Sequence, residues 1–206
     1  FIFSCNLLFS FLLKYPINPF TFSSLYLFNN FSVENKKFSE VLQEAIDKGF
    51  TEPDPREDLN GNDVGRKLLI LARELDLQNE FEEIQIQYLI PEALREGSAT
   101  DFLKRLSELD GIYQNIKDAQ GPNEVLRYIG ELSGDLQQDK GKLEVKLISV
   151  PANSALGSLK GSDSIFEIYT ESYGEQPIVI QGAGAGASVT ARGVFGDILR
   201  LSEKKL

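Results

Sequence analysis

The chain has 206 residues, 42% hydrophobic and 25% charged, a composition that fits one globular domain or slightly more. Its 31 acidic residues outnumber the 21 basic ones, and the net charge of −10 argues against nucleic acid or an anionic membrane as a main partner. It has no histidine and a single cysteine, Cys5, so we expect no intramolecular disulfide, no metal site and a reducing compartment such as the cytoplasm.

The N-terminal segment, residues 1–20, differs from everything that follows. The chain starts at Phe1 and contains no methionine, so we expect it to be part of a longer protein. The apolar run over 1–13 is shorter than the ~20 residues that cross a bilayer, and Pro16 interrupts its extension. Three interpretations stay open: an artefact of a reading-frame or splice boundary, a buried strand or helix, or a targeting segment.

From residue 21 onward the chain has the patterns of helices and strands. KFSEVLQEAIDKG (37–49) and NDVGRKLLILARELD (62–76) place apolar residues at helical spacing, and each predicts an amphipathic helix. IQIQYLI (84–90) alternates apolar residues before a proline, which predicts a strand. ATDFLKRLSELDGIYQNIKDA (99–119) predicts a third helix.

The pattern changes after Gly121-Pro122. Strands are predicted for EVLRYIGEL, KLEVKLISV, SIFEIYTES and PIVIQ, and the polar DLQQDKGK connects the first two as a hairpin. GASVTARGVFGDILRL is typical of a final helix. We therefore predict an α+β fold, with a mixed or antiparallel sheet of four or five strands covered by three or four helices.

An acidic stretch, TEPDPREDLNGNDVGRK (51–67), precedes the second helix. It holds five carboxylates: Glu52, Asp54, Glu57, Asp58 and Asp63. Its prolines predict an extended segment, with the helix beginning near 60–63 and capped by an asparagine. Asp63 and Lys67 are four positions apart and share one helical face. The stretch is either a solvated loop before a surface ion pair worth ~0.3–0.5 kcal/mol, or a site that binds a cation and moves a proton.

A glycine-rich stretch, QGAGAGASVTARG (181–193), follows the last predicted strand. Gly182, Gly184 and Gly186 would allow a ligand to approach the backbone at the start of a helix. The remaining residues leave no room for the next strand of a dinucleotide-binding fold, so we do not expect the first turn of such a domain. Two interpretations stay open: tight strand-to-helix packing, or a backbone wall beside a cofactor bound elsewhere.

Both stretches resemble the homoserine dehydrogenase family. GFTEPDPREDLNGNDVGRKLLILAR and LKGSDSIFEIYTESYGEQPIVIQGAGAGASVTARGVFGDILRL are similar to family segments in order and spacing, and SLYLFNNF resembles the approach to its dimer-forming helix. The resemblance covers about residues 21–203. It implies NADH- or NADPH-dependent interconversion of aspartate 4-semialdehyde and homoserine, on the route to threonine, isoleucine and methionine.

The resemblance also implies roles for individual residues. Gly49 and Glu52 would bind the substrate, with Glu52 facing its amino group and Asp58 as a supporting carboxylate. Asp63 would orient the substrate hydroxyl and the lysine, and Lys67 would be the catalytic proton donor. Gly182, Gly184 and Gly186 would contact the cofactor, Gly186 at its nicotinamide end.

By the same resemblance, residues 21–181 form a substrate-binding and dimerisation domain, and 182–206 return as a glycine turn and helix to a nucleotide-binding domain. That Rossmann domain, a family lysine and a monovalent-cation site have no counterpart in these residues, so we expect little activity from them alone. We expect a homodimer or higher oligomer, in the cytoplasm or, for a plant protein, the plastid. The alternatives are a non-catalytic dimerising remnant and an amino-acid-binding module.

Overall fold

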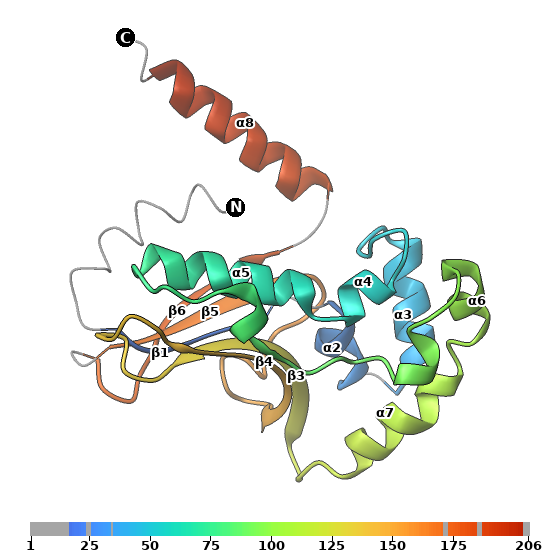
Figure 1. The fold of residues 1–206 in the computed structure, drawn as a ribbon. Helices are drawn as coiled ribbons and strands as arrows, with labels where there is room; N and C mark the ends of the chain where they lie inside the picture. Colours follow the sequence, from blue (N-terminus) through green and yellow to red (C-terminus); the bar gives the residue numbers. More distant parts are fainter. Residues whose placement is uncertain (1–16, 24–25, 34, 171–172, 185–186, 204–206) are drawn as a thin grey trace.

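A computed structural model describes residues 17–23, 26–33, 35–170, 173–184 and 187–203. Its centre is a six-stranded sheet in the order β2-β4-β3-β1-β5-β6, with helices packed on it (Figure 1). The strands are β1 (Ile17–Ser23), β2 (Gln85–Ile86), β3 (Glu124–Ser133), β4 (Lys142–Pro151), β5 (Asp163–Thr170) and β6 (Ile178–Ala183). The predicted α+β class with a mixed sheet is confirmed.

Hairpins account for most of the sheet. β3 pairs antiparallel with β4 along their whole length, and β5 pairs antiparallel with β6. β1 lies between these hairpins and pairs antiparallel with both β3 and β5. Only β2 runs parallel to its neighbour, β4, in the described residues, and it contributes two residues to the sheet edge.

The helices gather on one face and at one end of the sheet. They are α2 (Tyr26–Phe31), α3 (Phe38–Asp47), α4 (Arg56–Leu59), α5 (Asn62–Glu74), α6 (Ala99–Lys104), α7 (Glu108–Asp118) and α8 (Ala187–Glu203), with 3-10 turns η1 (Phe81–Glu83) and η2 (Glu92–Leu94). α5 packs on β3 and β4, whereas α2, α3 and α7 pack on one another. α8 extends away from the sheet (Figure 1), and five of its apolar side chains are exposed: Val194, Phe195, Ile198, Leu199 and Leu201.

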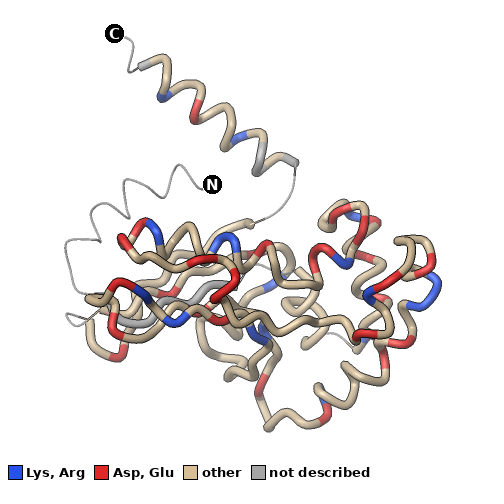
Figure 2. Tube along the Cα trace, viewed as in Figure 1, with Lys and Arg blue, Asp and Glu red and all other residues tan. Residues whose placement is uncertain are grey.

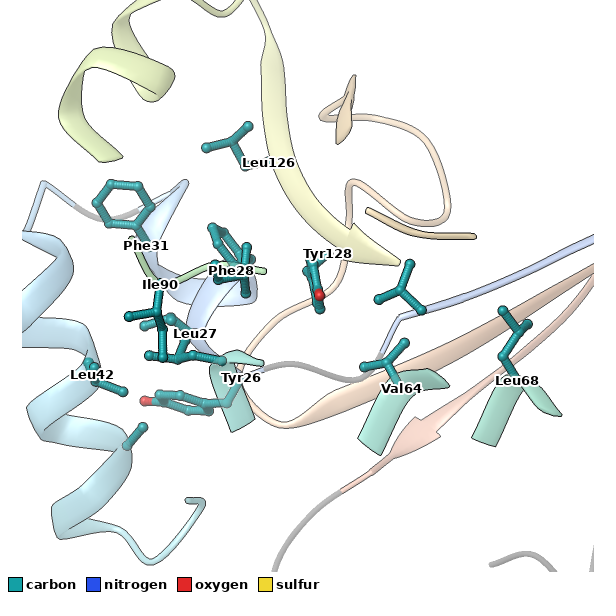
Figure 3. Packing of buried hydrophobic residues seen from close by; sticks show 14 of the residues in the cluster. Tyr26, Leu27, Phe28, Phe31, Leu42, Val64, Leu68, Ile90, Leu126 and Tyr128 are labelled. Carbon is teal, nitrogen blue, oxygen red and sulfur yellow. The ribbon is translucent and has the colours of Figure 1, made fainter. Parts of the chain in front are cut away.

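The main core joins the helices to the upper face of the sheet through aromatic side chains. The Phe38 ring stacks on Tyr113 with centroids 3.7 Å apart, and Phe31 meets both rings edge-on. Phe28 lies between this group and Tyr128 of β3 (Figure 3). Large aromatic side chains bury much apolar area, so this cluster fixes α2, α3 and α7 as one unit.

The opposite face of the sheet is covered by the loop between β4 and β5, which Arg127 holds in place. Arg127 of β3 is fully buried and donates hydrogen bonds to the carbonyls of Leu156, Gly157 and Leu159 in that loop. It also donates to the carbonyl of Phe28 in α2. Burial lowers the pKa of Arg127 to about 10, which leaves it charged at neutral pH. One side chain therefore connects both faces of the sheet.

Two predicted elements are wrong in extent. The helix expected over 99–119 is two helices, because the chain turns at 105–107 so that Phe102, Leu106 and Leu109 all become buried. The strand expected over 84–90 stops at Ile86. The hydroxyls of Tyr113 and Tyr128 donate to the carbonyls of Leu89 and Gln87, which removes those carbonyls from any strand pairing.

The sheet is also larger than predicted, because β1 adds a sixth strand to the five that the sequence indicated. β1 crosses the boundary that we placed between residues 20 and 21. A buried strand or helix was one of three interpretations of the N-terminal segment, and residues 17–20 do belong to a strand, β1. Residues 1–16 lie outside the described part of the chain.

Candidate active site

A cavity of about 140 Å³ lies where α2, α3, α4, α5 and the end of β6 meet. Its lining residues are Tyr26, Leu27, Leu42, Ala45, Phe50, Thr51, Asp58, Leu59, Asp63, Val64, Lys67 and Gly184. Four of the lining side chains are ionisable. Three of them, Asp58, Asp63 and Lys67, come from the acidic stretch, and the fourth is Tyr26. The stretch is part of a concave site as well as a solvated loop.

Helix α5 brings Asp63 and Lys67 to the cavity. Its apolar positions, including Val64 and Leu68, are buried against the sheet (Figure 3), which directs the polar face outward. The Lys67 ammonium lies 2.6 Å from an Asp63 carboxylate oxygen. Their side chains are 44% and 58% exposed, so a bound molecule can reach both groups.

The turn before α5 depends on Asn60 and Gly61. The Asn60 carboxamide oxygen accepts a hydrogen bond from the Asn62 backbone N–H, but the N-cap residue of α5 is Gly61, so the predicted asparagine cap is wrong. Gly61 has φ +77°, and a Cβ there would lie 2.1 Å from the Tyr128 hydroxyl. A residue without a side chain is thus required where the chain enters the helix.

The prolines of the acidic stretch predict an extended segment, but part of the stretch is helical. Pro55 has φ −61° and ψ −12° and precedes the short helix α4, since proline fits the start of a helix well. Asp54 pairs with Arg56 at 2.6 Å, and Arg56 also donates to the carbonyls of Arg95 and Gly97. Arg56 lowers the pKa of Asp54 through this hydrogen bond. Asp54 is therefore a structural carboxylate.

Asp58 is the most perturbed carboxylate of the cavity. It accepts a hydrogen bond from the Glu52 backbone N–H at 2.9 Å. Burial raises the pKa of Asp58 to about 6, and the nearby carboxylates of Glu52 and Asp63 act in the same direction. A perturbed carboxylate in a concave site is typical of functional positions.

Glu52 and Gly49 lie next to lining residues in the chain but are not themselves part of the cavity lining. Glu52 has an exposed side chain outside the cavity lining, and its backbone holds Asp58. Gly49 has φ +68° and ends α3, where its N–H donates to the carbonyl of Ile46. It directs the chain so that Phe50 and Thr51 line the cavity.

The glycine-rich stretch reaches the cavity through Gly184. Its N–H donates to the Ser162 carbonyl at 2.8 Å, and a Cβ there would lie 1.6 Å from the Ser164 hydroxyl. This close packing leaves backbone without a side chain at the cavity edge. The two interpretations of the glycine stretch, tight packing and a backbone wall beside a cofactor, are therefore compatible. Gly182 belongs to β6 outside the lining, and Gly186 lies outside the described residues.

Sequence reasoning missed the wall formed by α2 and α3. Tyr26 is 8% exposed and its ring lies 5.1 Å from Phe50, centroid to centroid. The Lys48 ammonium donates a hydrogen bond to the Tyr26 oxygen at 2.7 Å. This hydrogen bond raises the pKa of Lys48, with a further contribution from Glu44. Tyr26 and Lys48 are 22 positions apart in the chain, and no helical or strand spacing predicts a contact over that separation.

The described residues were compared with three other kinds of site: a basic nucleic-acid surface, a metal centre and a membrane span. Lysine and arginine are interspersed with acidic residues along the trace in Figure 2, without a continuous basic stripe over the part of the chain that is drawn in colour. Within the described ranges, no three potential metal ligands cluster. None of the helices placed there has the length and hydrophobicity needed to cross a bilayer.

Comparison with known proteins identifies the family. Residues 20–199 match homoserine dehydrogenase. The chain belongs to the homoserine dehydrogenase family. It is 45% identical over 179 residues to bifunctional aspartokinase/homoserine dehydrogenase 1, chloroplastic, of Arabidopsis thaliana, which covers 86% of this chain and 19% of that protein. It is 42% identical over 190 residues to homoserine dehydrogenase of Paracoccidioides brasiliensis, covering 87% of this chain and 50% of the fungal protein.

Solved structures agree with the family fold. A Candida auris protein of unknown function shares 36% identity with this homoserine dehydrogenase chain at a TM-score of 0.79, covering 96% of this chain and 57% of that one. A hyperthermophilic archaeal homoserine dehydrogenase in complex with NADPH has a TM-score of 0.62 at 23% identity, covering 94% and 50%. The chain thus spans about half the length of these two proteins and a fifth of the plant enzyme.

Proposed function

We propose that this chain is the substrate-binding part of a homoserine dehydrogenase, which interconverts aspartate 4-semialdehyde and homoserine with NADH or NADPH. One observation carries the proposal: Lys67 and Asp63, 2.6 Å apart, line the same cavity as Gly184, which comes from the other end of the chain. Family membership of residues 20–199 supplies the class of reaction, since homoserine dehydrogenases are NAD(P)-dependent oxidoreductases.

Lys67 is the proposed proton donor. Carbonyl reduction leaves a negative charge on the carbonyl oxygen, and an ammonium within hydrogen-bond reach can supply the proton that this oxygen needs. Asp63 holds the Lys67 ammonium at the cavity and can also accept a hydrogen bond from the substrate hydroxyl. In the reverse direction, Lys67 takes the proton from the homoserine hydroxyl.

The carboxylates hold the substrate's ammonium group. Glu52 is proposed to face this ammonium group. Asp58, which lines the cavity and accepts a hydrogen bond from the Glu52 backbone N–H, is the proposed supporting carboxylate. Gly49 shapes the turn that positions both the Phe50 ring and Thr51. This division of roles accounts for an acidic stretch next to a single cavity lysine.

The glycine turn is the proposed edge of the nicotinamide site. Gly184 fits this role because it brings backbone without a side chain to the cavity that Lys67 lines. Gly182 and Gly186 are proposed to support the same edge. NADH or NADPH, when bound, supplies the hydride. The exposed apolar side chains of α8 are proposed to pack against a nucleotide-binding domain that holds most of the cofactor.

Membership also suggests a setting for the protein. We propose a role in threonine, isoleucine and methionine biosynthesis, and assembly as a homodimer or higher oligomer. The Arabidopsis relative is a chloroplastic protein by name, which supports the plastid as an alternative to the cytoplasm. Light scattering of the purified protein would test the assembly, with a monomer at micromolar concentration contradicting it.

A chimera tests the activity. Residues 20–199 would replace the matching segment of the Paracoccidioides brasiliensis enzyme, and NADPH-dependent reduction of aspartate 4-semialdehyde would be measured. We expect turnover, and we expect Lys67→Ala to lower kcat by about 10²- to 10⁴-fold because the proton donor is lost. Circular dichroism should show an unchanged fold.

Lys104→Ala is the matched control. Lys104 also pairs with an acid on its own helix, Asp101 at 3.6 Å, but it is 70% exposed and lies outside the cavity lining. It should leave kcat unchanged. A folded chimera without turnover, or equal turnover in the Lys67→Ala and Lys104→Ala variants, would refute the proposed function or the proposed role of Lys67.

A further inference from the structure

Asn29 is a buried polar side chain of α2 that lies outside the cavity lining and that the proposed reaction does not use. Its carboxamide nitrogen donates hydrogen bonds to the carbonyls of Gly161 at 3.1 Å and Asp163 at 2.9 Å. These acceptors belong to the end of the β4–β5 loop and the start of β5, more than 130 positions along the chain. The two hydrogen bonds form a clamp, the Asn29 clamp, between α2 and this distant segment.

The segment that Asn29 holds also positions the glycine edge of the cavity. Ser162 lies between the two acceptors, and its own carbonyl accepts a hydrogen bond from the Gly184 N–H at 2.8 Å. A Cβ on Gly184 would lie 3.3 Å from this carbonyl oxygen, so the glycine fits closely against the segment. Asn29 therefore fixes the peptide groups on both sides of the carbonyl that orients Gly184.

The helix that carries Asn29 supplies another part of the cavity wall. Tyr26 and Leu27 line the cavity from the first turn of α2 (Figure 3). The Asn30 carboxamide donates to the Tyr26 carbonyl at 2.6 Å and so supports this turn. A short series of hydrogen bonds thus connects the α2 wall to Gly184, although the two parts of the cavity come from opposite ends of the chain.

The second polar atom of the Asn29 side chain indicates what the clamp is for. The carboxamide oxygen is buried and has no hydrogen-bond partner among the described residues. An unpaired buried acceptor destabilises a fold, and such a group in a folded protein calls for an explanation. Asn29 keeps its two donations at the expense of that oxygen, which favours a role in positioning over one in stability.

We propose that Asn29 is a positioning residue that sets the spacing between the α2 wall of the cavity and the glycine edge at Gly184. The inference rests on the proposed function, in which this edge borders the nicotinamide. Hydride transfer needs the reacting atoms about 3–3.5 Å apart, and a small displacement lowers the rate steeply. Asn29 touches neither substrate nor cofactor, and it acts through Ser162 and Gly184.

Amide hydrogen exchange of the 206-residue chain, followed by NMR, tests the clamp without reference to the reaction. In Asn29→Leu we expect the Gly184 amide to exchange about tenfold faster, because its acceptor is no longer held. Asn29→Ser, whose hydroxyl can donate to one carbonyl, should give a smaller increase. An unchanged Gly184 rate in a folded variant would overturn the proposal, and so would loss of folding in both variants, which would show a structural role.

Asn79→Leu is the matched control. Asn79 is also buried, and its carboxamide exchanges two hydrogen bonds with the backbone of Gly141, 62 positions away. It lies outside the cavity lining and has no bond to the segment that holds Gly184. The variant should be less stable than wild type but should keep the wild-type exchange rate at Gly184. Equally faster exchange at Gly184 in Asn79→Leu and Asn29→Leu would show general loosening and would contradict the clamp.

Kinetics of the chimera test the consequence for the reaction. We expect Asn29→Leu to lower kcat by about 10- to 100-fold with little change in KM, because the reacting atoms are less well aligned. The kinetic isotope effect with NADPH deuterated at the transferred position should rise, since hydride transfer becomes the slow step. Asn79→Leu should change neither quantity. Wild-type kcat and isotope effect in Asn29→Leu would overturn the positioning role.

The two measurements separate this inference from the proposed function. An active chimera with wild-type kinetics and wild-type Gly184 exchange in Asn29→Leu overturns the inference alone. A folded but inactive wild-type chimera overturns the proposed function and, with it, the role of Asn29 in hydride transfer. Faster Gly184 exchange in Asn29→Leu would in that case still support the clamp between the two parts of the cavity.

Discussion

At the scale of single residues, local surroundings give two acids of the acidic stretch, Asp54 and Asp58, opposite pKa shifts. Asp54 is paired with Arg56, which lowers the pKa of Asp54, whereas Asp58 is half-buried without a cation and has its pKa raised to about 6. Both are aspartates in the same short stretch of chain. Their opposite shifts show that composition alone cannot assign chemistry to such a segment.

The raised pKa of Asp58 predicts a pH-dependent stability. The folded chain holds a proton on Asp58 up to about pH 6, whereas a free aspartate has a pKa of 3.8. Stability from this proton is complete below the unfolded pKa and is lost as pH rises through 6. We expect Asp58→Asn to raise the free energy of unfolding at pH 8 by about 2 kcal/mol, and by little at pH 4, in urea denaturation.

Asp54→Asn is the matched control with the opposite sign. Because Arg56 lowers the pKa of Asp54, this carboxylate stabilises the fold above its unfolded pKa and loses that effect as the pH falls through its folded pKa. The Asn variant should be less stable than wild type at pH 8. If both variants changed stability in the same direction at pH 8, the assigned environment of Asp58 would be wrong.

At the scale of elements, the entry into α5 decides where Asp63 and Lys67 lie. The α4–α5 turn requires a left-handed residue at Gly61, and Tyr128 and Ile86 occupy the space that a Cβ of this residue would need. Tyr128 in turn donates to the carbonyl of Gln87. The position of α5 therefore depends on the sheet beneath it.

Gly61→Ala tests this dependence. The added methyl group would lie 2.1 Å from the Tyr128 hydroxyl and 2.7 Å from Ile86, so we expect a loss of about 3 kcal/mol or more in unfolding free energy. Gly97→Ala is the control, because it measures the cost of placing a side chain at a positive φ without a steric clash. Gly97 also has a positive φ, +92°, but open space around it, so its loss should be about 1 kcal/mol. Equal losses would contradict the packing role of Gly61.

At the scale of the whole molecule, β1 unites the two hairpins. It pairs with β3 on one side and β5 on the other, and Thr21 faces Glu131 and Glu167 in the two pairings. Through β5 and β6 it links Gly184 to the cavity residues of the first helices. The site therefore depends on a strand from the segment with the least regular sequence.

A proline in β1 should separate the hairpins. Thr21→Pro removes an N–H between two paired strands, and we expect more than about 3 kcal/mol of destabilisation or loss of a cooperative urea transition. Glu92→Pro is the control, since Glu92 is the first residue of η2 and follows an extended residue, where proline fits. Cooperative unfolding of Thr21→Pro at wild-type stability would refute the central role of β1.

Sequence patterns were sufficient to locate the elements whose hydrogen bonds and burial are local. Apolar periodicity located α3 and α5, alternation located β3 to β6, and the four-residue spacing placed Asp63 beside Lys67. Family resemblance added the reaction. Only the tertiary structure decided the limits of β2, the break between α6 and α7, the position of β1 and the Tyr26–Lys48 pair. These features depend on contacts between distant segments, and such contacts leave no periodic pattern in the chain.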